Sequence, residues 1–484
     1  MADPLAAKIA LARAVGGLSR MRGGGATSAP GKALLQMEPR AIERLAGRLE
    51  RGSVLVSATN GKTTSARMLA AILAEEGVRV VHNAAGANMA GGIASTLLEA
   101  ARAHGEIAGE LGLFEVDEFW LGSLVQEVRP RAILLGNLFR DQLDRYGELE
   151  SIAERWGAAL DRGPGAAARL VLNADDPLVA DLGRERTGAG EVGAGRDGGV
   201  LYYGLEDEGV ALSGMAHAAD AKHCRNCGAP YEFERVHLGH LGHYRCPSCG
   251  QARPEPRVSA RRVELEGVRT ASFDLCTPEG QARVRLSVPG LYNVYNALGA
   301  AAAAHALEIP LASIVAGLER AEAAFGRAES VSVAGRELRI MLVKNPAGAN
   351  EVLRTLALEP GEHDLLGVLN DGIADGRDVS WIWDADFEAL VGHVRRARCS
   401  GTRAAELALR LRYAGVDPER IEVEEDLKRA LDGALADAPE DARRGEGARA
   451  GGAGSPVYAL PTYTAMLALR ELLVARGEAR SAWE

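Results

Sequence analysis

The chain has 484 residues, and its 56 Lys and Arg residues against 66 Asp and Glu residues give a formal net charge of −10 at pH 7. Because cationic side chains drive binding to the nucleic-acid backbone, this balance argues against nucleic acid as the main partner. Hydrophobic residues make up 47% of the chain and charged residues 25%, which is typical of a globular protein whose length suggests several domains.

Residues 1–50 are expected to form a helical lead-in. Their first apolar stretch is interrupted by Lys8 and Arg13, and it lacks the basic start and long apolar block of a secretory signal. No uninterrupted apolar run reaches the length of about 18 residues that suggests a membrane-spanning helix. We therefore expect a cytoplasmic protein without a transmembrane segment.

From residue 51 onward, short β-branched runs alternate with Ala- and Leu-rich helical stretches, which predicts an α/β fold. A helix is predicted over residues 63–76, and an Ala-rich helix over residues 291–307. Polar residues lie close to the carboxyl ends of the predicted strands, where open α/β sheets bind ligands. The strands are predicted at residues 53–56, 78–81, 113–116 and 132–135.

The sequence ATNGKTT at residues 58–64 lies between the first predicted strand and its helix. Backbone N–H groups at a helix N-terminus bind phosphate oxygens. In such a loop Lys62 would reach the β- and γ-phosphates, and the Thr63 hydroxyl would ligate Mg²⁺. A capped helix after a strand is the alternative interpretation. The predicted nucleotide-binding residues are Thr59, Asn60, Gly61, Lys62, Thr63 and Thr64.

Glu115 lies in the acidic sequence FEVDE, which follows another predicted strand. A carboxylate at this position suits Mg²⁺, because that ion prefers hard oxygen ligands. A solvated acidic turn is the alternative. Residues 137–145 (NLFRDQLDR) follow the next strand and, taken alone, indicate only a charged loop.

Two Cys-x-x-Cys pairs, Cys224 with Cys227 and Cys246 with Cys249, are separated by 18 residues. This spacing predicts a structural Zn²⁺ ribbon in which four thiolates close a tetrahedral site. Redox-active pairs are the competing interpretation. Residues 221–256, rich in Cys, His, Gly and Pro, are expected to form a small inserted module. Since a closed four-Cys site has no open position, we assign it to folding and not to catalysis.

A second α/β series is expected over residues 326–484, with strands at residues 338–343, 365–369 and 457–460. Its most distinctive stretch is residues 369–384, which contains four aspartates and two of the five tryptophans. A strand, a turn and a sheet edge that packs the two Trp rings would also account for this composition.

These segments together resemble the Mur ligase family, whose members use ATP to join an amine to a carboxylate through an acyl phosphate. The resemblance implies a P-loop central domain at residues 51–325, which carries the zinc ribbon, and a C-terminal Rossmann-like α/β domain at residues 326–484. It also implies adenine contacts from Asn293 and Asn296 and a phosphate contact from Arg327. Further matching segments are residues 83–88, 173–176, 290–296 and 326–329.

Some positions depart from the Mur ligase pattern. Gln142 stands where family members commonly carry a metal-binding His, and what fills that metal position is left open. Residues 150–162 contain no Lys that could be carbamoylated, and residues 342–346 (LVKNP) replace the usual D-x-A-H-N-P element. These departures argue against an incoming amino acid as the nucleophile.

The four-Cys ribbon and residues 344–348, 369–384 and 460–466 resemble the MurT branch of this family. The resemblance implies the ATP-using subunit of lipid II isoglutaminyl synthase. Such a subunit amidates the α-carboxylate of D-glutamate in the peptidoglycan stem peptide, on lipid II at the cytoplasmic membrane face. Ammonia would come from a glutaminase subunit, GatD, in a heterodimer.

In that complex a MurT-type aspartate completes the Cys-His-Asp arrangement of the partner. Asp378 is the first candidate, Asp384 the second and Asp375 the third. A single-chain Mur or folylpolyglutamate synthetase-like ligase that adds an amino acid is the alternative function. A zinc-ribbon adaptor for nucleotide or nucleic acid is a third hypothesis, and the net charge of −10 argues against its nucleic-acid form.

Overall fold

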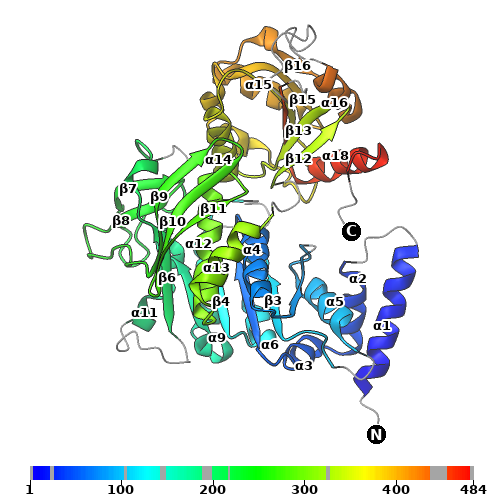
Figure 1. Ribbon diagram of the computed structural model, residues 1–484, viewed down its shortest axis with the longest axis vertical. Coiled ribbons are helices and arrows are strands. Elements are labelled where there is room, and N and C mark those ends of the chain that lie inside the picture. Colours follow the sequence, from blue (N-terminus) through cyan, green and yellow to red (C-terminus); the bar gives the residue numbers. More distant parts are fainter. Residues whose placement is uncertain are drawn as a thin grey trace.

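The computed structural model describes residues 4–21, 27–84, 86–102, 106–141, 149–187, 199–215, 219–322, 327–436 and 455–479. Two separate sheets, one of nine strands and one of six, organise most of this chain. In Figure 1 the nine-stranded sheet lies in the lower part of the molecule and the six-stranded sheet in the upper part. None of the helices in these ranges combines the length and the apolar character that crossing a membrane requires.

Three helices precede the first strand: α1 (Pro4–Met21), α2 (Ala29–Met37) and α3 (Ala41–Ala46). They pack against α5 (Ala90–Ala100) and belong to the same apolar core as the central sheet. Gly31 permits the close approach of α2 to α5, because a Cβ there would overlap the Gly91 carbonyl oxygen. These helices lie within the lead-in predicted for residues 1–50.

The nine-stranded sheet has the order β11-β10-β9-β6-β5-β4-β1-β3-β2. All pairs from β2 through β9 are parallel, and β9, β10 and β11 form an antiparallel meander. The strands are β1 (Ser53–Ser57), β2 (Val80–His82), β3 (Leu111–Glu115), β4 (Ala132–Leu135), β5 (Arg169–Asn173), β6 (Val200–Leu205), β9 (Val258–Glu266), β10 (Thr270–Thr277) and β11 (Gly280–Leu286).

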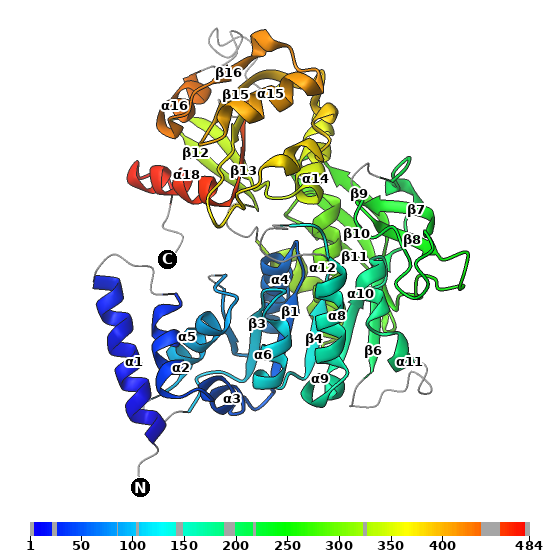
Figure 2. The same cartoon turned by 180° about the vertical axis from the view of Figure 1, so that it is seen from behind.

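Helices cover both faces of this sheet, which explains why β1, β3 and β4 are buried along their whole length. Helices α4, α12 and α13 lie on the face seen in Figure 1, and α6, α8 and α9 lie on the opposite face in Figure 2. The helices of this region are α4 (Lys62–Glu75), α6 (Leu121–Val128), α8 (Leu149–Leu160), α9 (Gly163–Ala167), α10 (Pro177–Asp181), α11 (Arg184–Thr187), α12 (Leu291–Ala306) and α13 (Leu311–Arg320), with the 3-10 helix η1 (Glu208–Val210).

The predicted strands at residues 53–56, 113–116 and 132–135 are confirmed within two residues as β1, β3 and β4. The strand predicted at residues 78–81 begins two residues later, as β2. The predicted Ala-rich helix is α12, whose alanines are almost all fully buried. Their small side chains let the helix lie close to the sheet.

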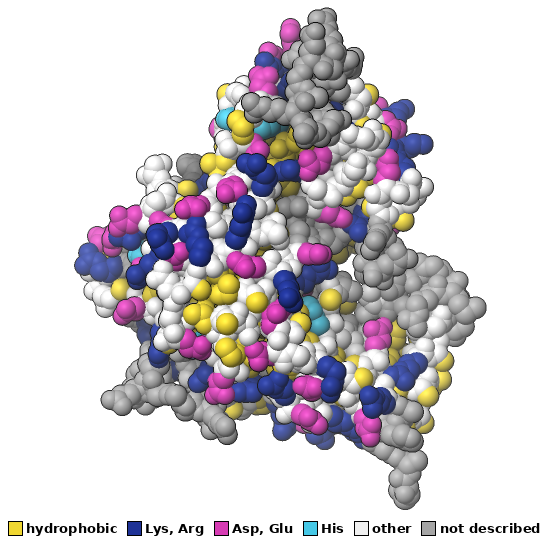
Figure 3. All heavy atoms as spheres, viewed as in Figure 1, with side chains coloured by type: hydrophobic (Ala, Val, Ile, Leu, Met, Phe, Trp, Pro, Cys, Tyr) yellow, Lys and Arg dark blue, Asp and Glu magenta, His cyan; other side chains and the backbone are white. Residues whose placement is uncertain are grey.

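The outer strands of the meander are exposed on one face, where basic and acidic side chains are intermingled (Figure 3). Arg283 lies 2.6 Å from Glu264, and Arg285 lies 3.6 Å from Glu266. Cross-strand pairs of opposite charge stabilise such a surface modestly. Arg283 and Arg285 of β11 are therefore neutralised by Glu264 and Glu266 of β9, across the intervening strand β10.

The ribbon is an insertion between β6 and β9. It contains the antiparallel hairpin of β7 (Glu232–Leu238) and β8 (Leu241–Arg245), which forms a sheet of its own. The buried cluster inside the ribbon is small and consists of Cys224, Tyr231, Tyr244 and Cys246. So few buried side chains cannot by themselves stabilise a module of this size.

The six-stranded sheet has the order β12-β13-β17-β14-β15-β16, with parallel pairs except between β12 and β13. The predicted strands at residues 338–343, 365–369 and 457–460 are confirmed as β13, β14 and β17. The elements are β12 (Arg327–Val333), β13 (Arg336–Met341), α14 (Pro346–Ala357), β14 (His363–Val368), η2 (Ser380–Trp383), η3 (Phe387–Leu390), β15 (Val394–Ser400), α15 (Ala404–Ala414), η4 (Pro418–Arg420), β16 (Ile421–Val423), α16 (Leu427–Ala436), β17 (Val457–Pro461) and α18 (Tyr463–Ala475). Since the two sheets share no strand, we propose a domain boundary near residue 325.

Candidate functional site

The predicted phosphate loop connects β1 to the first turn of α4, at the carboxyl edge of the nine-stranded sheet. Gly61 caps the helix with φ at +89°, and a Cβ there would overlap the Asn296 side-chain oxygen. Asn137, which follows β4, accepts a hydrogen bond from the Asn60 N–H at 2.9 Å and donates to the Asn60 carbonyl at 3.0 Å. The loop is thus fixed by neighbours on both sides, as a preformed phosphate site requires.

Lys62 lies at the start of α4 and is 8% exposed. Its Nζ donates to Glu118 Oε2 at 2.9 Å and to the Ala58 carbonyl. Burial by itself favours the neutral amine, but the negative charges of Glu118 and Glu115 raise the pKa of Lys62. The side chain is therefore a buried cation beside the loop that would bind phosphates.

Glu115 ends β3 and is 3% exposed. The Asn83 side chain accepts a hydrogen bond from the Glu115 N–H and donates to its carbonyl, both at 2.8 Å. Within the described part of the chain, the buried oxygen Oε2 of Glu115 has no hydrogen-bond partner. A buried carboxylate oxygen needs such a partner, so this position fits the Mg²⁺ ion predicted for it.

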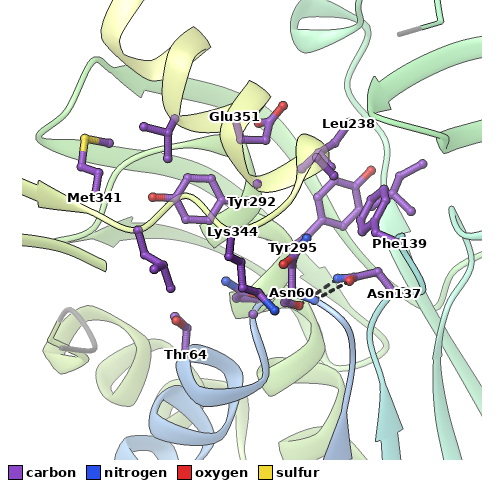
Figure 4. Close-up of a pocket in the computed structure, with 17 residues that line it drawn as sticks. Asn60, Thr64, Asn137, Phe139, Leu238, Tyr292, Tyr295, Met341, Lys344 and Glu351 are labelled. Carbon is purple, nitrogen blue, oxygen red and sulfur yellow. Dashed lines mark hydrogen bonds between the residues drawn. The ribbon is translucent and has the colours of Figure 1, made fainter. Parts of the chain in front are cut away.

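A cavity of about 780 Å³, open to solvent, extends from the phosphate loop to α14. In Figure 4 Thr64 and Asn60 lie at one end, Glu351 lies at the other, and Tyr292 and Lys344 lie between them. Most of its lining is apolar. The lining residues are Asn60, Gly61, Thr64, Asn137, Phe139, Leu238, Leu241, Tyr292, Tyr295, Asn296, Met341, Leu342, Lys344, Ala347, Gly348, Glu351 and Val352.

The two asparagines predicted to contact adenine have different positions. Asn296 lines the cavity, whereas Asn293 lies behind it and is 2% exposed. Asn293 donates to the Pro289 carbonyl at 2.7 Å and accepts from Asn296 Nδ2 at 3.1 Å. The geometry therefore gives Asn293 the role of orienting the Asn296 amide.

The six-stranded domain contacts the phosphate loop directly. Asn345, just before α14, forms a reciprocal pair with Asn60, donating to its Oδ1 at 3.0 Å and accepting from its Nδ2 at 3.3 Å. Lys344 donates to Asp141 at 2.5 Å and to the Thr59 carbonyl at 3.3 Å. The cavity is thus lined by residues of both domains.

A second cavity, of about 610 Å³, shares Lys344 with the first. It lies between the segment after β4 and the aspartate-rich stretch that precedes η2. Its lining residues include Arg140, Asp141, Lys344, Asn345, Asp375, Asp378, Ser380 and Asp384. Residues 140–141 and residues 375–384, far apart along the chain, therefore meet at one place.

The three candidate aspartates have different surroundings in this cavity. Asp375 is 4% exposed and accepts from both the N–H and the hydroxyl of Thr464. Asp384 is exposed and lies 3.6 Å from Arg140. Asp378 is also exposed, and the hydroxyl and N–H of Ser380 lower its pKa.

The four predicted zinc ligands converge at the base of the ribbon. Their sulfur atoms all lie within 4.8 Å of one another. The Sγ atoms of Cys224 and Cys249 are 3.5 Å apart, and those of Cys227 and Cys246 are 3.4 Å apart. Since a disulfide bond is about 2.05 Å long, no cysteine of this cluster is bridged, and the cluster is compatible with Zn²⁺.

Two predicted site residues are not fully described by the structure. Gln142 lies outside the described residues. The main chain of Arg327 begins β12 and pairs with Met341, but its side chain is not among those described.

Several site residues had not been predicted from the sequence. Glu118, the partner of Lys62, lies in the acidic sequence FEVDE, but spacing alone does not separate it from Glu115. Asn137 and Asp141 lay in the segment whose charge pattern alone indicated only a loop. Glu351 carried no signal, because one Glu in a predicted helix looks like any other.

Known proteins resemble the chain in sequence. Residues 56–210 match the family model described as Mur ligase middle domain, and residues 342–466 match that described as MurT ligase C-terminal. The chain is 32% identical to the lipid II isoglutaminyl synthase (glutamine-hydrolyzing) subunit MurT of Streptococcus pneumoniae, over 95% of this chain and 94% of the relative. It is 31% identical to the subunit of the same name from Staphylococcus aureus N315, over 87% of this chain and 90% of the relative.

Solved structures agree in fold. A pseudomurein peptide ligase type C from Methanothermus fervidus has a TM-score of 0.62 at 23% identity and covers 88% of this chain and 79% of its own. The Mycobacterium tuberculosis folylpolyglutamate synthase complexed with ADP and AMPPCP has a TM-score of 0.59 at 16% identity, covering 94% of this chain and 99% of its own. At these identities the likeness supports the architecture and not the activity.

Glu351 provides a test of the cavity's electrostatics. It is 5% exposed, and burial raises its pKa to about 7, although Arg354 at 2.6 Å favours the ionised form. A raised carboxyl pKa means that the folded protein retains a proton that the unfolded chain releases. The resulting stability is fully present below the unfolded pKa of 4.5 and is lost as pH rises to about 7.

We therefore expect Glu351→Gln to raise the melting temperature more at pH 8 than at pH 5. The gain in the free energy of unfolding should reach up to about 3 kcal/mol, because each unit of pKa shift corresponds to about 1.4 kcal/mol. Thermal unfolding from pH 5 to pH 8 measures it, with Glu154→Gln on the exposed face of α8 as a control. A difference in melting temperature between variant and wild type that does not change with pH would contradict the raised pKa of Glu351.

Proposed function

This chain belongs to the MurT family, and we propose that it is the ATP-using subunit of a lipid II isoglutaminyl synthase. It would convert the α-carboxylate of D-glutamate in the stem peptide of lipid II to the amide of D-isoglutamine, at the cytoplasmic face of the membrane. A GatD-type glutaminase subunit would supply ammonia in a heterodimer. The likeness to MurT relatives over nearly the whole chain carries the proposal.

The chemistry has two steps. A carboxylate oxygen of the substrate attacks the γ-phosphorus of ATP, so that ADP leaves and an acyl phosphate forms. Ammonia then attacks the acyl carbon, phosphate leaves, and the amide forms with the loss of one proton. An activated acyl group is needed, because a free carboxylate is a poor acceptor for an amine.

The phosphate loop would hold ATP through the N–H groups at the start of α4 and the buried cation of Lys62. Glu115 and the Thr63 hydroxyl would hold Mg²⁺, which neutralises charge on the phosphates during transfer. Asn296 would contact the base, and Arg327 would contact phosphate. The four cysteines would hold Zn²⁺ for structure.

Ammonia as the nucleophile agrees with the contacts of Lys344. This residue stands where amino-acid-adding Mur ligases commonly carry part of their D-x-A-H-N-P element. Here it is engaged by Asp141 and the Thr59 carbonyl. The neighbouring cavity, which shares Lys344, is lined in part by the aspartate-rich stretch. An amino-acid-adding ligase of the same fold remains the alternative, and consumption of ATP with an amino acid and no partner would support it.

Asp378 is the aspartate best suited to complete a partner's Cys-His-Asp arrangement. Its contacts leave it exposed and ionised, since Ser380 lowers its pKa. Asp375 is occupied by Thr464, and Asp384 lies near Arg140. An ionised carboxylate that faces the partner could orient and stabilise an imidazolium.

Exposed apolar side chains beside these aspartates support a protein partner. Ile373 is 79% exposed, Trp383 is 48% exposed and Tyr413 is 71% exposed. The rings of Trp383 and Tyr413 pack edge to face, with centroids 5.6 Å apart. Exposed aromatic groups of this kind commonly anchor protein interfaces.

We expect Asp378→Asn to abolish glutamine-driven amidation, by about a hundredfold or more, while ammonium-driven amidation stays near the wild-type rate. The amide keeps the shape of the side chain but loses the charge that the partner's His needs. Asp384→Asn, in the same exposed stretch, is the matched control and should retain both activities. Equal loss with both nitrogen sources would rule out this role for Asp378.

Glu115→Gln should lower amidation by about a hundredfold or more with either nitrogen source, because it removes the charge expected to hold Mg²⁺. Raising the Mg²⁺ concentration should restore part of the activity. Rates across a magnesium titration, at saturating ATP, measure this. An unchanged magnesium requirement would assign the metal to other residues.

Replacing Trp383 or Tyr413 by Ala should weaken association with the glutaminase subunit by about tenfold or more. Ammonium-driven amidation should not change, since neither residue lines the nucleotide cavity. Titration of the partner by calorimetry gives the affinity. Leu358→Ala is the control. Leu358 is likewise exposed, at 55%, but it follows the C-terminal end of α14 and does not belong to the stretch that carries Trp383.

A further inference from the structure

The ribbon hairpin runs from the four-cysteine cluster to the nucleotide cavity. Cys246 follows the last residue of β8 directly, and β7 begins five residues after Cys227. At the other end of the same two strands, Leu238 and Leu241 line the cavity. One short hairpin therefore connects the predicted metal centre to the predicted ATP site.

The tip of the hairpin is inserted into the central domain. Leu238 is 5% exposed, Leu241 is 1% exposed, and His240 between them is fully buried. Both leucines belong to the apolar core that also contains Phe139 and Tyr295. The tip is thus part of the wall of the cavity and not a surface appendage.

Gly239 lets the turn fit against that wall. Its φ is +59°, and a Cβ there would lie 2.7 Å from Cε1 of Phe139, which is too close. The His240 ring packs on Phe139 with centroids 4.6 Å apart, and His240 Nε2 lies 3.3 Å from Asp176. Phe139 itself lines the cavity. The turn, Phe139 and the cavity therefore depend on one another for position.

Asp175 joins the ribbon to helix α12. It is fully buried, and its carbonyl accepts from the Gly242 N–H at 2.9 Å. Its carboxylate accepts from Arg253 Nε and from the Tyr295 hydroxyl, both at 2.6 Å. Tyr295 lines the cavity, and Gly242 and Arg253 belong to the ribbon. A displacement of the hairpin would disturb this shared carboxylate as well as the apolar wall.

We propose that the ribbon positions the nucleotide site: the metal-bound cysteines fix the base of the β7–β8 hairpin, so that Leu238 and Leu241 close the apolar side of the ATP cavity. These leucines are positioning residues for the adenine end of the nucleotide. The inference rests on the proposed nucleotide function. It gives the four-cysteine centre a role in ATP affinity beyond stabilising the ribbon itself.

The test is direct binding of a non-hydrolysable ATP analogue with Mg²⁺ to the full-length, zinc-loaded chain, together with its zinc content. Leu241→Ala should weaken binding by about tenfold or more, since a missing apolar contact in a binding pocket has an effect of that order. Zinc content should stay at the wild-type level. Leu275→Ala in β10 removes an equally buried leucine from the same core, away from the cavity, and should leave binding unchanged.

Gly239→Ala tests the turn. It should weaken nucleotide binding comparably, because the new methyl group pushes the turn away from Phe139. Gly335→Ala is the matched control: its φ of +81° imposes the same kind of backbone strain, but nothing lies within 4 Å of its Cβ. Only the first substitution should change affinity.

Zinc removal with a chelator should reproduce the effect of Leu241→Ala on binding and expose the hairpin to limited proteolysis. Re-addition of Zn²⁺ should restore both. Nucleotide affinity within threefold of the wild type after zinc loss, or in both hairpin variants, would overturn the proposal. A wild-type chain that binds no ATP analogue would instead refute the ligase function, and with it this role of the ribbon.

Discussion

The buried charge of Lys62 is the constraint on which the nucleotide site depends. A buried ammonium group is strongly destabilising unless it is paired, and Glu118 pairs with it at 2.9 Å. The carbonyl of Glu118 accepts a hydrogen bond from the Trp156 indole at 2.8 Å, which fixes the turn after β3. Since β3 lies next to β1 in the sheet, the acidic turn and the phosphate loop meet at one edge. In the proposed nucleotide site, phosphate oxygens would replace the carboxylate as partners of Lys62, so that its charge would not be left unpaired.

The second constraint is that the six-stranded domain meets the central domain at the predicted phosphate loop. The Asn60–Asn345 pair links the phosphate loop to the residue that caps α14. Beside it, Lys344 lies between the nucleotide cavity and the aspartate-lined cavity and contributes to both. A rotation of the C-terminal domain would change the phosphate loop and the region around Asp378 together. In the proposed heterodimer, glutamine hydrolysis by the partner and phosphoryl transfer in this chain would thus have a common physical link.

Much of the fold was predictable from the sequence, because its signals are local. The buried strand β1, the loop ending in Lys62 and the Ala-rich α12 each follow from residue type and spacing over short segments. The spacing of the four cysteines likewise predicted the cluster in which they converge. The features that the sequence did not predict depend on contacts between distant segments. Spacing could not show that Asn293 orients Asn296, or that Glu351 faces the same cavity as the phosphate loop.

The ribbon shows how a small insertion can be both stable and useful. Its own buried cluster comprises four residues, two of them cysteines, and so little apolar burial requires a metal or an outside support. The hairpin has a candidate metal site in the four cysteines at its base, and the central domain buries its tip around His240. The burial that stabilises the tip also places Leu238 and Leu241 in the cavity wall. An insertion stabilised in this way cannot loosen without changing the pocket it borders, which is why stability of the ribbon and affinity for the nucleotide should be coupled.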